Sequence, residues 1–441
     1  MIECGHDLPA PRTARSPPVS DASQKPCILI IGEAVAPTGF ARVIRSVFSR
    51  LTDHYELHQL ATRYDGGPHD WPWTLLVASK GTSVYGYDQV VPLVETLRPA
   101  LVFLLYDISF QPVYWAQLRR ASWRPPVVMY TPVEAGPIAP EIIEPLEGVA
   151  RYVMYNEFGR GVIADSLTAI RTRRPDFGFP SLDVIAHGVD RDRFYPLAAS
   201  HDRVHCCDPS TAESTADEVA RRLAARQQLG IDTPETRGAF IVLNANRNMP
   251  RKRIDLTLQG FAQFARDKPA NVKLYLHMAT EDSGWNVLLL AKRYGIFDRL
   301  IMTRADNQRP AFDDATMNLL YNACDVGLTT STGEGWGMVA FEHGATRAAQ
   351  VMPRHTSLAE LWDGAAEFVE PVSSMTWPGN LTEGQVVSAE GVAAALQRLY
   401  EDSAHRDSLA HRAYANAHRP EFAWDVVAAQ WRRLLDDTIS R

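Results

Sequence analysis

The chain alternates short runs of aliphatic and β-branched residues with longer segments of helical periodicity, and it does so in two successive series. The first series contains "CILIIGEA", "ALVFLLYD", "PVVMYTPV", "ARYVMYN" and "LDVIAHGV", and the second contains "AFIVLNAN", "VKLYLHMA", "RLIMT" and "DVGLTTS". This alternation is typical of parallel sheets whose strands are joined by crossover helices. It predicts an α/β chain of two doubly wound, Rossmann-like domains that face each other across a cleft, with ligands bound at the carboxyl ends of the strands.

The length of 441 residues also favours two domains, because one ordinary core does not grow that large. We predict an N-terminal domain over residues 26–195 and a C-terminal domain over residues 237–415. Residues 1–25, rich in Pro, Ser and Arg, are predicted to form a disordered arm. Residues 196–236 are predicted to be a linker that carries one exposed helix, because the periodicity weakens there. Residues 416–441 are predicted to be a C-terminal helix, and a return of this helix to the N-terminal domain is left open.

The composition argues against two classes of partner. The 45 Lys and Arg residues are spread along a chain of formal net charge −7, so no nucleic-acid binding is expected. No apolar run reaches the ~18 residues that a transmembrane helix needs. The N-terminal segment lacks the apolar core of a secretory signal, and we therefore expect a cytoplasmic protein.

A glycine-rich stretch, "STGEGWGMVAFEHG", follows the last strand of the second series. The pattern predicts a strand, a tight turn and a helix start, where free backbone N–H groups favour an anion such as a phosphate. Glu334 lies in the predicted loop, and Glu342 lies in the predicted helix. Carboxylates accept hydrogen bonds from sugar hydroxyls, so the pair suits a nucleotide sugar. A solvated acid that complements the helix dipole is an equally good interpretation of Glu342 alone.

A basic segment, "NANRNMPRKRID", follows the first strand of the second series. Arg247 and Lys252 lie around Pro250 in a loop that leads into a helix. Basic side chains at the carboxyl end of a strand are suited to neutralising a diphosphate. Taken alone, the segment is better explained as a solvated basic patch, and its position beside the glycine-rich loop favours the binding role.

Four segments together resemble the retaining GT-B glycosyltransferases of family 4, the group that includes glycogen-synthase-like and sucrose-synthase-like enzymes. They are "EGWGMVAFE" for the Glu-x7-Glu motif, "NRNMPRK" for the Arg-x4-Lys donor loop, "VIAHGVDRDRFYPL" for the end of the N-terminal domain, and "APTGFARV" for the first loop. The resemblance extends from about Cys27 to the C-terminus.

The resemblance implies a donor site in the C-terminal domain. Arg247 and Lys252 would hold the diphosphate, Glu342 the ribose, and Glu334 with the backbone that follows it the transferred sugar. The implied donor-binding residues are Gly39, Gly335, Trp336, Gly337, Met338, Val339 and Glu342. The implied catalytic residues are Glu334, Arg247, Lys252 and Asp107.

Asp107 stands at the end of a strand after which many relatives carry a histidine, and it would contact the sugar or the acceptor. Capping of the following helix is the alternative interpretation of this residue. Glu134 at another strand end and Trp71 in "GGPHDWPW" are candidate acceptor contacts, although simple loop packing is the favoured interpretation of the tryptophan. No metal site and no cofactor are predicted, because fixed cations and a helix start suffice for the leaving diphosphate.

We therefore expect a metal-independent, retaining glycosyltransferase, with hexosyl transfer favoured and a UDP-, GDP- or ADP-sugar as donor. The acceptor is a glycan, a protein, a small molecule or a lipid-linked sugar, and the last of these leaves a peripheral membrane contact open. Two alternatives are kept: another GT-B enzyme, such as a phosphorylase or an epimerase, and a non-catalytic scaffold or binding subunit with the same fold.

Overall fold

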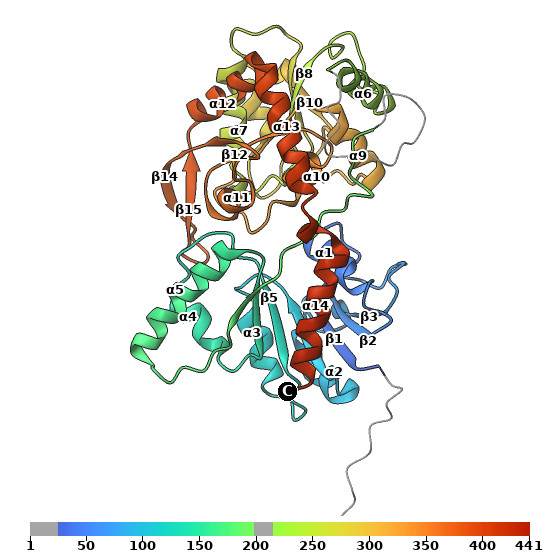
Figure 1. Cartoon of the computed structure of the whole chain (residues 1–441), viewed down its shortest axis with the longest axis vertical. Coiled ribbons are helices and arrows are strands. Elements are labelled where there is room, and N and C mark those ends of the chain that lie inside the picture. The colour runs from blue at the N-terminus through green and yellow to red at the C-terminus, as the bar shows by residue number, and fades with distance from the viewer. Residues whose placement is uncertain (1–24, 198–214) are drawn as a thin grey trace, which may run out of the picture.

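Each of the two predicted series of strands forms one parallel sheet (Figure 1). The computed structural model describes residues 25–197 and 215–441. The first sheet has seven strands in the order β3-β2-β1-β4-β5-β6-β7, and the second has six in the order β10-β9-β8-β11-β12-β13. Both orders step outward from the first strand of the series in two directions, which places a crevice at the carboxyl ends of the central strands. The predicted fold class, two Rossmann-like domains in a GT-B arrangement, is confirmed.

The N-terminal domain buries its central strands almost completely. β1 and β4 are continuous apolar runs, as strands covered by helices on both faces require. Its strands are β1 (Cys27–Glu33), β2 (Glu56–Thr62), β3 (Thr74–Val77), β4 (Leu101–Leu105), β5 (Val127–Thr131), β6 (Arg151–Met154) and β7 (Leu182–Val184). Its helices are α1 (Gly39–Phe48), α2 (Val90–Leu97), α3 (Gln111–Leu118), α4 (Pro140–Ile143) and α5 (Glu157–Arg173).

The C-terminal domain repeats the pattern with shorter strands. Its strands are β8 (Phe240–Asn244), β9 (Val272–Leu276), β10 (Leu300–Met302), β11 (Val326–Leu328), β12 (Ala349–Pro353) and β13 (Glu367–Val369). Its helices are α6 (Thr215–Gln228), α7 (Ile254–Ala265), α8 (Val287–Arg293), α9 (Asp314–Ala323), α10 (Met338–Gly344), α11 (Thr356–Leu361), α12 (Ala389–Glu401) and α13 (Ser403–Ala417). Ion pairs and hydrogen bonds join the two domains, for example from Asn156 Nδ2 to the carbonyl of Gly335 at 2.6 Å.

The last helix, α14 (Trp424–Ile439), lies along the N-terminal domain although it follows α13 of the other domain (Figure 1). The ring of Trp431 packs edge-on against Phe103 of β4 and Tyr130 of β5, with centroid distances of 5.1 and 4.7 Å. The hydroxyl of Tyr55 donates to Asp436 at 2.6 Å. The C-terminal segment therefore completes the core of the first sheet.

Part of the predicted linker belongs to the C-terminal domain. The helix expected to be exposed, α6, packs against α9, and Arg226 is buried with its guanidinium 2.9 Å from the carboxylate of Asp325. The prediction of exposure holds for one face of α6, where Val219 is 58% exposed, and is wrong for the face that contains Arg226. An arginine can be buried when a carboxylate pairs with it, and the sequence does not show this pairing. The rest of the linker, residues 198–214, and the predicted arm up to residue 24 lie outside the described residues.

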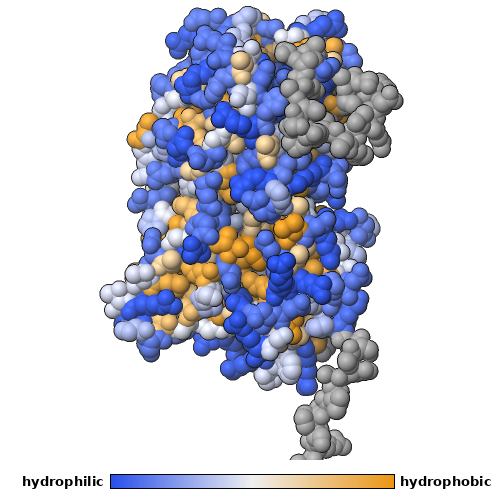
Figure 2. Space-filling model, viewed as in Figure 1, coloured by the Kyte–Doolittle hydropathy of each residue, from blue (hydrophilic) through white to orange (hydrophobic). Residues whose placement is uncertain are grey.

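The alternation of apolar runs did not reveal several strands, one of which is β12 of the second sheet. β2 and β3 extend the first sheet, and β14 (Pro371–Thr376) pairs with β15 (Glu383–Val387) in an antiparallel hairpin beside the cleft. Figure 2 shows apolar side chains gathered mainly on the N-terminal domain near the boundary between the domains on this face. In residues 25–197 and 215–441, no helix combines the length and the apolarity that crossing a bilayer requires.

Candidate active site

A cavity of about 1020 Å³ lies between the carboxyl ends of the two sheets. Its N-terminal wall comes from the loops after β1, β4 and β5, and its C-terminal wall comes from the loops after β8 and β9 and from the start of α10. Ligands of doubly wound folds bind at this end of the sheet. The cavity is therefore the candidate site.

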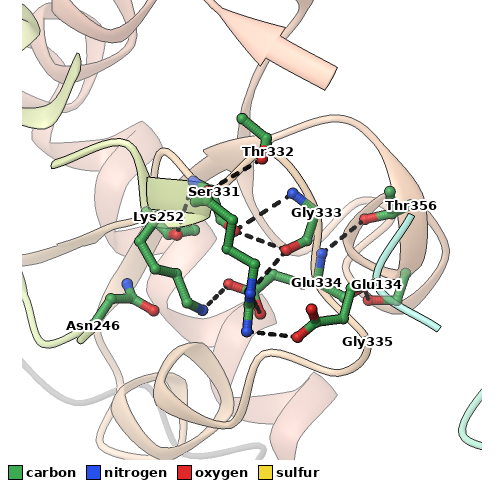
Figure 3. A network of polar contacts seen from close by, with 12 residues as sticks. Glu134, Asn246, Lys252, Ser331, Thr332, Gly333, Glu334, Gly335 and Thr356 are labelled. Atoms are coloured by element: carbon green, nitrogen blue, oxygen red, sulfur yellow. Dashed lines mark hydrogen bonds and ion pairs between the residues drawn. The ribbon is translucent and has the colours of Figure 1, made fainter. Parts of the chain in front are cut away.

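Two cations and two carboxylates form an ion-pair network in this cavity (Figure 3). The ammonium of Lys252 contacts the carboxylate of Glu334, and the guanidinium of Arg251 lies 3.2 Å from the same carboxylate. Arg251 also lies 2.5 Å from Glu134 of the other domain. The network therefore crosses the boundary between the domains.

The network fixes the charge state of Glu334. Burial alone would raise the pKa of Glu334, but the charges of Lys252 and Arg251 hold that pKa down at about 2. Burial lowers the pKa of Lys252 and raises the pKa of Glu134. Glu334 is thus an ionised anchor for two cations rather than a proton acceptor, and the cations keep donors directed at the cavity.

The backbone around Lys252 explains why two cations meet at Glu334. Residues Pro250–Lys252 form a single 3-10 turn, and Arg253 adopts a left-handed conformation with φ of 47° before α7 begins. The next side chain, Arg253, turns away to bind Asp255 at 2.9 Å. The tight turn therefore directs two of three consecutive basic residues toward the cavity.

Asp107 lies across the cavity, two residues after β4. Its carboxylate makes no hydrogen bond or ion pair with any residue that the structure describes. Burial, with a smaller contribution from Glu134, raises the pKa of Asp107 to about 6. No donor or cation in direct contact stabilises the ionised form of this carboxylate, as expected for a group that binds a ligand.

Replacing Asp107 with Asn is expected to stabilise the ligand-free protein. Because the pKa of Asp107 is higher in the native state than in the unfolded chain, the free energy of unfolding falls as the pH rises from about 4 to about 6. The loss remains at higher pH. Allowing for partial exposure, we expect Asp107→Asn to gain about 1–2 kcal/mol at neutral pH and nothing below pH 4. Urea denaturation of both proteins across this pH range measures the difference, and an Asn variant that is less stable at neutral pH would contradict it.

Arg247 lies at the outer rim of the cavity with 43% of its side chain exposed. Its guanidinium is 2.8 Å from Asp282, which Arg309 also contacts at 3.0 Å. Hydrogen bonds from Arg247 and then from Arg309 hold the pKa of Asp282 well below its usual range, so this carboxylate stays ionised. The structure thus places Arg247 and Lys252 on the same wall, with Arg247 the more accessible.

The predicted glycine-rich loop lies where the two domains approach each other. Gly39 at the start of α1 faces Met338 at the start of α10, and a Cβ on this glycine would lie 3.1 Å from the Met338 sulfur. Gly337 has a φ of 87°, which a glycine adopts without strain, and it precedes α10. The predicted donor residues Gly39, Gly335, Trp336, Gly337, Met338 and Val339 all line the cavity. Because α10 has only seven residues, the fixed cations are the main source of positive charge.

Glu342 is turned away from the cavity. Its carboxylate accepts a hydrogen bond from Tyr321 at 2.8 Å and lies 3.8 Å from Arg42 of the N-terminal domain. Arg42 also binds Asp314 at 2.5 Å. The predicted ribose contact has no support from this geometry, because the carboxylate already has partners at the domain boundary, and it is not part of the function proposed below.

Of the two candidate acceptor contacts, only Glu134 lines the cavity. Trp71 is buried edge-on against Trp73, with ring centroids 5.1 Å apart, and the guanidinium of Arg45 lies 5.9 Å from its ring. The acceptor role of Trp71 is corrected to loop packing, because burial leaves its ring no free face in the cavity.

The sequence reasoning missed several residues of the cavity wall. Arg251 was treated only as part of a basic run, and Glu33 only as the end of a strand. His187 Nδ1 lies in hydrogen-bond contact with the hydroxyl of Tyr130, at 2.8 Å, and burial lowers the pKa of His187 to about 3, so its ring is neutral. The missed residues that line the cavity include Glu33, Arg63, Tyr155, His187 and Arg251. Arg63 and Tyr155 directly follow β2 and β6, and Glu33 is the last residue of β1, so a strand end was the signal that could have found these three.

No protein-family model matches the chain, and a search of curated proteins finds no match. Solved structures do match. The sucrose-phosphate synthase (tll1590) from Thermosynechococcus elongatus is 16% identical, with a TM-score of 0.66 over 95% of this chain and 100% of that one. HepE (Alr3699) from Anabaena, in complex with UDP and glucose, is 17% identical, with a TM-score of 0.63 over 93% of this chain and 100% of that one.

A third match is an α,α-trehalose-phosphate synthase (UDP-forming) from Burkholderia vietnamiensis. It is 13% identical, with a TM-score of 0.64 over 94% of this chain and 99% of that one. These matches span both domains, so the chain has the GT-B fold over its whole described length. At such identities the likeness establishes the fold, and the chemistry has to be argued from the cavity.

Proposed function

We propose that this protein is a glycosyltransferase that moves a sugar from a nucleotide-sugar donor to an acceptor hydroxyl. The observation that carries the proposal is the pair of cations, Lys252 and Arg251, held by Glu334 at the carboxyl end of the second sheet. The fold supports it, because HepE, which shares this fold, has been crystallised with UDP-glucose.

In this proposal the donor diphosphate binds at Lys252 and Arg251, with Arg247 at the rim. Two negative phosphate groups then face three cations, which is the pairing that charge-assisted hydrogen bonds favour. The transferred sugar lies next to Glu334 and the backbone of Gly335. We propose that no metal is required, since these fixed cations supply the positive charge that the leaving diphosphate needs.

The resemblance to family 4 leads us to propose retention of the anomeric configuration. The bond between the anomeric carbon and the phosphate oxygen breaks, and its electron pair remains on the diphosphate, where Lys252 and Arg251 stabilise the charge. The acceptor oxygen attacks the same face of the sugar, and its proton passes to the departing phosphate oxygen. Glu334, ionised and paired, stays in place and orients the cations.

Turnover of nucleotide sugars tests this function. Full-length protein is incubated in EDTA with UDP-, GDP- and ADP-glucose, and NMR follows the nucleoside diphosphate and the released sugar. We expect slow hydrolysis of one donor, with the α anomer appearing first, and a loss of about 10²-fold or more in Glu334→Gln. Failure to release sugar from any donor would favour the scaffold alternative, and first appearance of the β anomer would refute retention.

A further inference from the structure

The two walls of the cavity carry opposite charge. On the wall from the C-terminal domain, four cations face two carboxylates; these residues are Arg247, Arg251, Lys252, Arg309, Asp282 and Glu334. On the wall from the N-terminal domain, three carboxylates, Glu33, Asp107 and Glu134, accompany one cation, Arg63, and Glu134 is also paired across the cavity with Arg251. The cationic wall suits the donor diphosphate, and the anionic wall is left for the acceptor.

The carboxylates of the anionic wall are incompletely paired within the protein. Asp107 has no hydrogen bond or ion pair among the described residues, and Glu33, with 7% of its side chain exposed, has only Arg63 at 3.5 Å. Arg63 is itself half exposed, at 51%. Buried carboxylates are normally paired, so this wall lacks positive charge.

Tyr155 provides an independent indication of a ligand on the same wall. Its side chain is 4% exposed and lines the cavity, and its buried hydroxyl has no hydrogen-bond partner in the described part of the chain. Burial, and then the charges of Tyr130, Asp107 and Glu134, raise the pKa of Tyr155 well above its usual value. A buried hydroxyl without a partner beside two carboxylates marks a polar position that a ligand would satisfy.

We propose, on the basis of the function proposed above, that the acceptor is an amine-bearing polyol, such as an amino sugar or an aminocyclitol, whose ammonium group binds Asp107 and Glu33. Tyr155 supplies a hydrogen bond to the same ligand. A phosphorylated sugar is disfavoured, because its phosphate would face the incompletely paired Glu33 and Asp107, where Arg63 is the cation of the same wall and Arg251 is already paired with Glu134.

Sugars that differ in one group test the proposal. We would titrate 2-, 3- and 6-aminodeoxyglucose, glucose and glucose 6-phosphate into the full chain at neutral pH, by ligand-observed NMR, with a saturating nucleoside diphosphate. At least one amino sugar is expected to bind about tenfold tighter than glucose, the factor that one charge-assisted hydrogen bond supplies, and glucose 6-phosphate more weakly than glucose.

Two variants change the charge of the wall in opposite directions. Asp107→Asn is expected to remove most of the preference for the amine, and Arg63→Gln to increase it. The proposal would be overturned if the wild type bound the amino sugars and glucose equally, or if it bound glucose 6-phosphate more tightly and Arg63→Gln abolished that binding. In either case, binding of a nucleoside diphosphate would still support the transferase function. Failure of every nucleoside diphosphate to bind would overturn both.

Discussion

Replacing Lys252 with Met is expected to lower kcat/KM for nucleotide-sugar turnover by about 10²- to 10³-fold, as loss of one fixed charge at a developing anion does in other enzymes. Methionine has nearly the length of the lysine stem, so the substitution removes the charge and leaves the volume. Steady-state rates with the donor identified by NMR measure the effect. Because Lys252 opposes charge that grows as the bond breaks, most of the loss is expected in kcat.

Lys292→Met is the matched control, because Lys292 is exposed at the end of α8, where its ammonium lies 5.0 Å from the ring of Phe297. We expect this variant to retain the wild-type rate. Urea denaturation of Lys252→Met shows whether the protein still folds when Glu334 keeps only Arg251 as a partner. A folded Lys252→Met variant with the wild-type kcat would exclude the leaving-group role of Lys252.

Replacing Trp431 with Ala is expected to cost about 3–5 kcal/mol of the free energy of unfolding. The indole is fully buried between α14 and the first sheet, where it packs against Phe103 and Tyr130. Its loss removes aromatic contacts and leaves a cavity that rigid strands cannot fill. Denaturant unfolding followed by circular dichroism measures the difference.

Val426→Ala is the control for this prediction, since Val426 belongs to the same helix and is 41% exposed. We expect this substitution to change the free energy of unfolding by no more than about 0.5 kcal/mol. If Trp431→Ala is as mild as Val426→Ala, α14 does not hold the first sheet together in the way the structure describes.

The sequence predicted best where burial is complete. β1, β4, β5 and β8 are continuous apolar runs, and the structure buries nearly every residue in them. β14, in contrast, has largely exposed side chains and pairs only with β15, so no apolar run marks the hairpin. A hydrophobic pattern indicates which residues are buried and does not indicate which backbones pair. Strands with exposed side chains are therefore not predicted from it.

Within the site, the sequence identified Asp107 and Glu134 from their positions at strand ends, and Lys252 and Glu334 from the motifs that carry the family resemblance. Lys252, Glu334, Asp107 and Glu134 were named in advance, and all four line the cavity. Arg251 was not identified, because the geometry of one turn decides which residues of "RKR" face inward. The spacing of residues along the chain does not show which side chains of this turn point into the cavity.

The position of Glu342 depended on a partner distant in sequence. Its carboxylate lies between Tyr321 and Arg42, and Arg42 belongs to the other domain. The spacing of eight residues from Glu334 placed both glutamates near one loop but did not fix the face of α10 on which Glu342 lies. Contacts between domains decide such orientations, and they leave no local pattern in the sequence.

Calorimetric titration of UDP, GDP and ADP in EDTA, into the wild type and into Lys252→Met, tests the central claim most directly. The account predicts that one nucleotide binds the wild type, and that Lys252→Met binds it at least about tenfold more weakly, as expected for loss of a charge-assisted contact. Lack of binding by all three nucleotides, or equal affinity of both proteins for the one that binds, would contradict a donor site at Lys252.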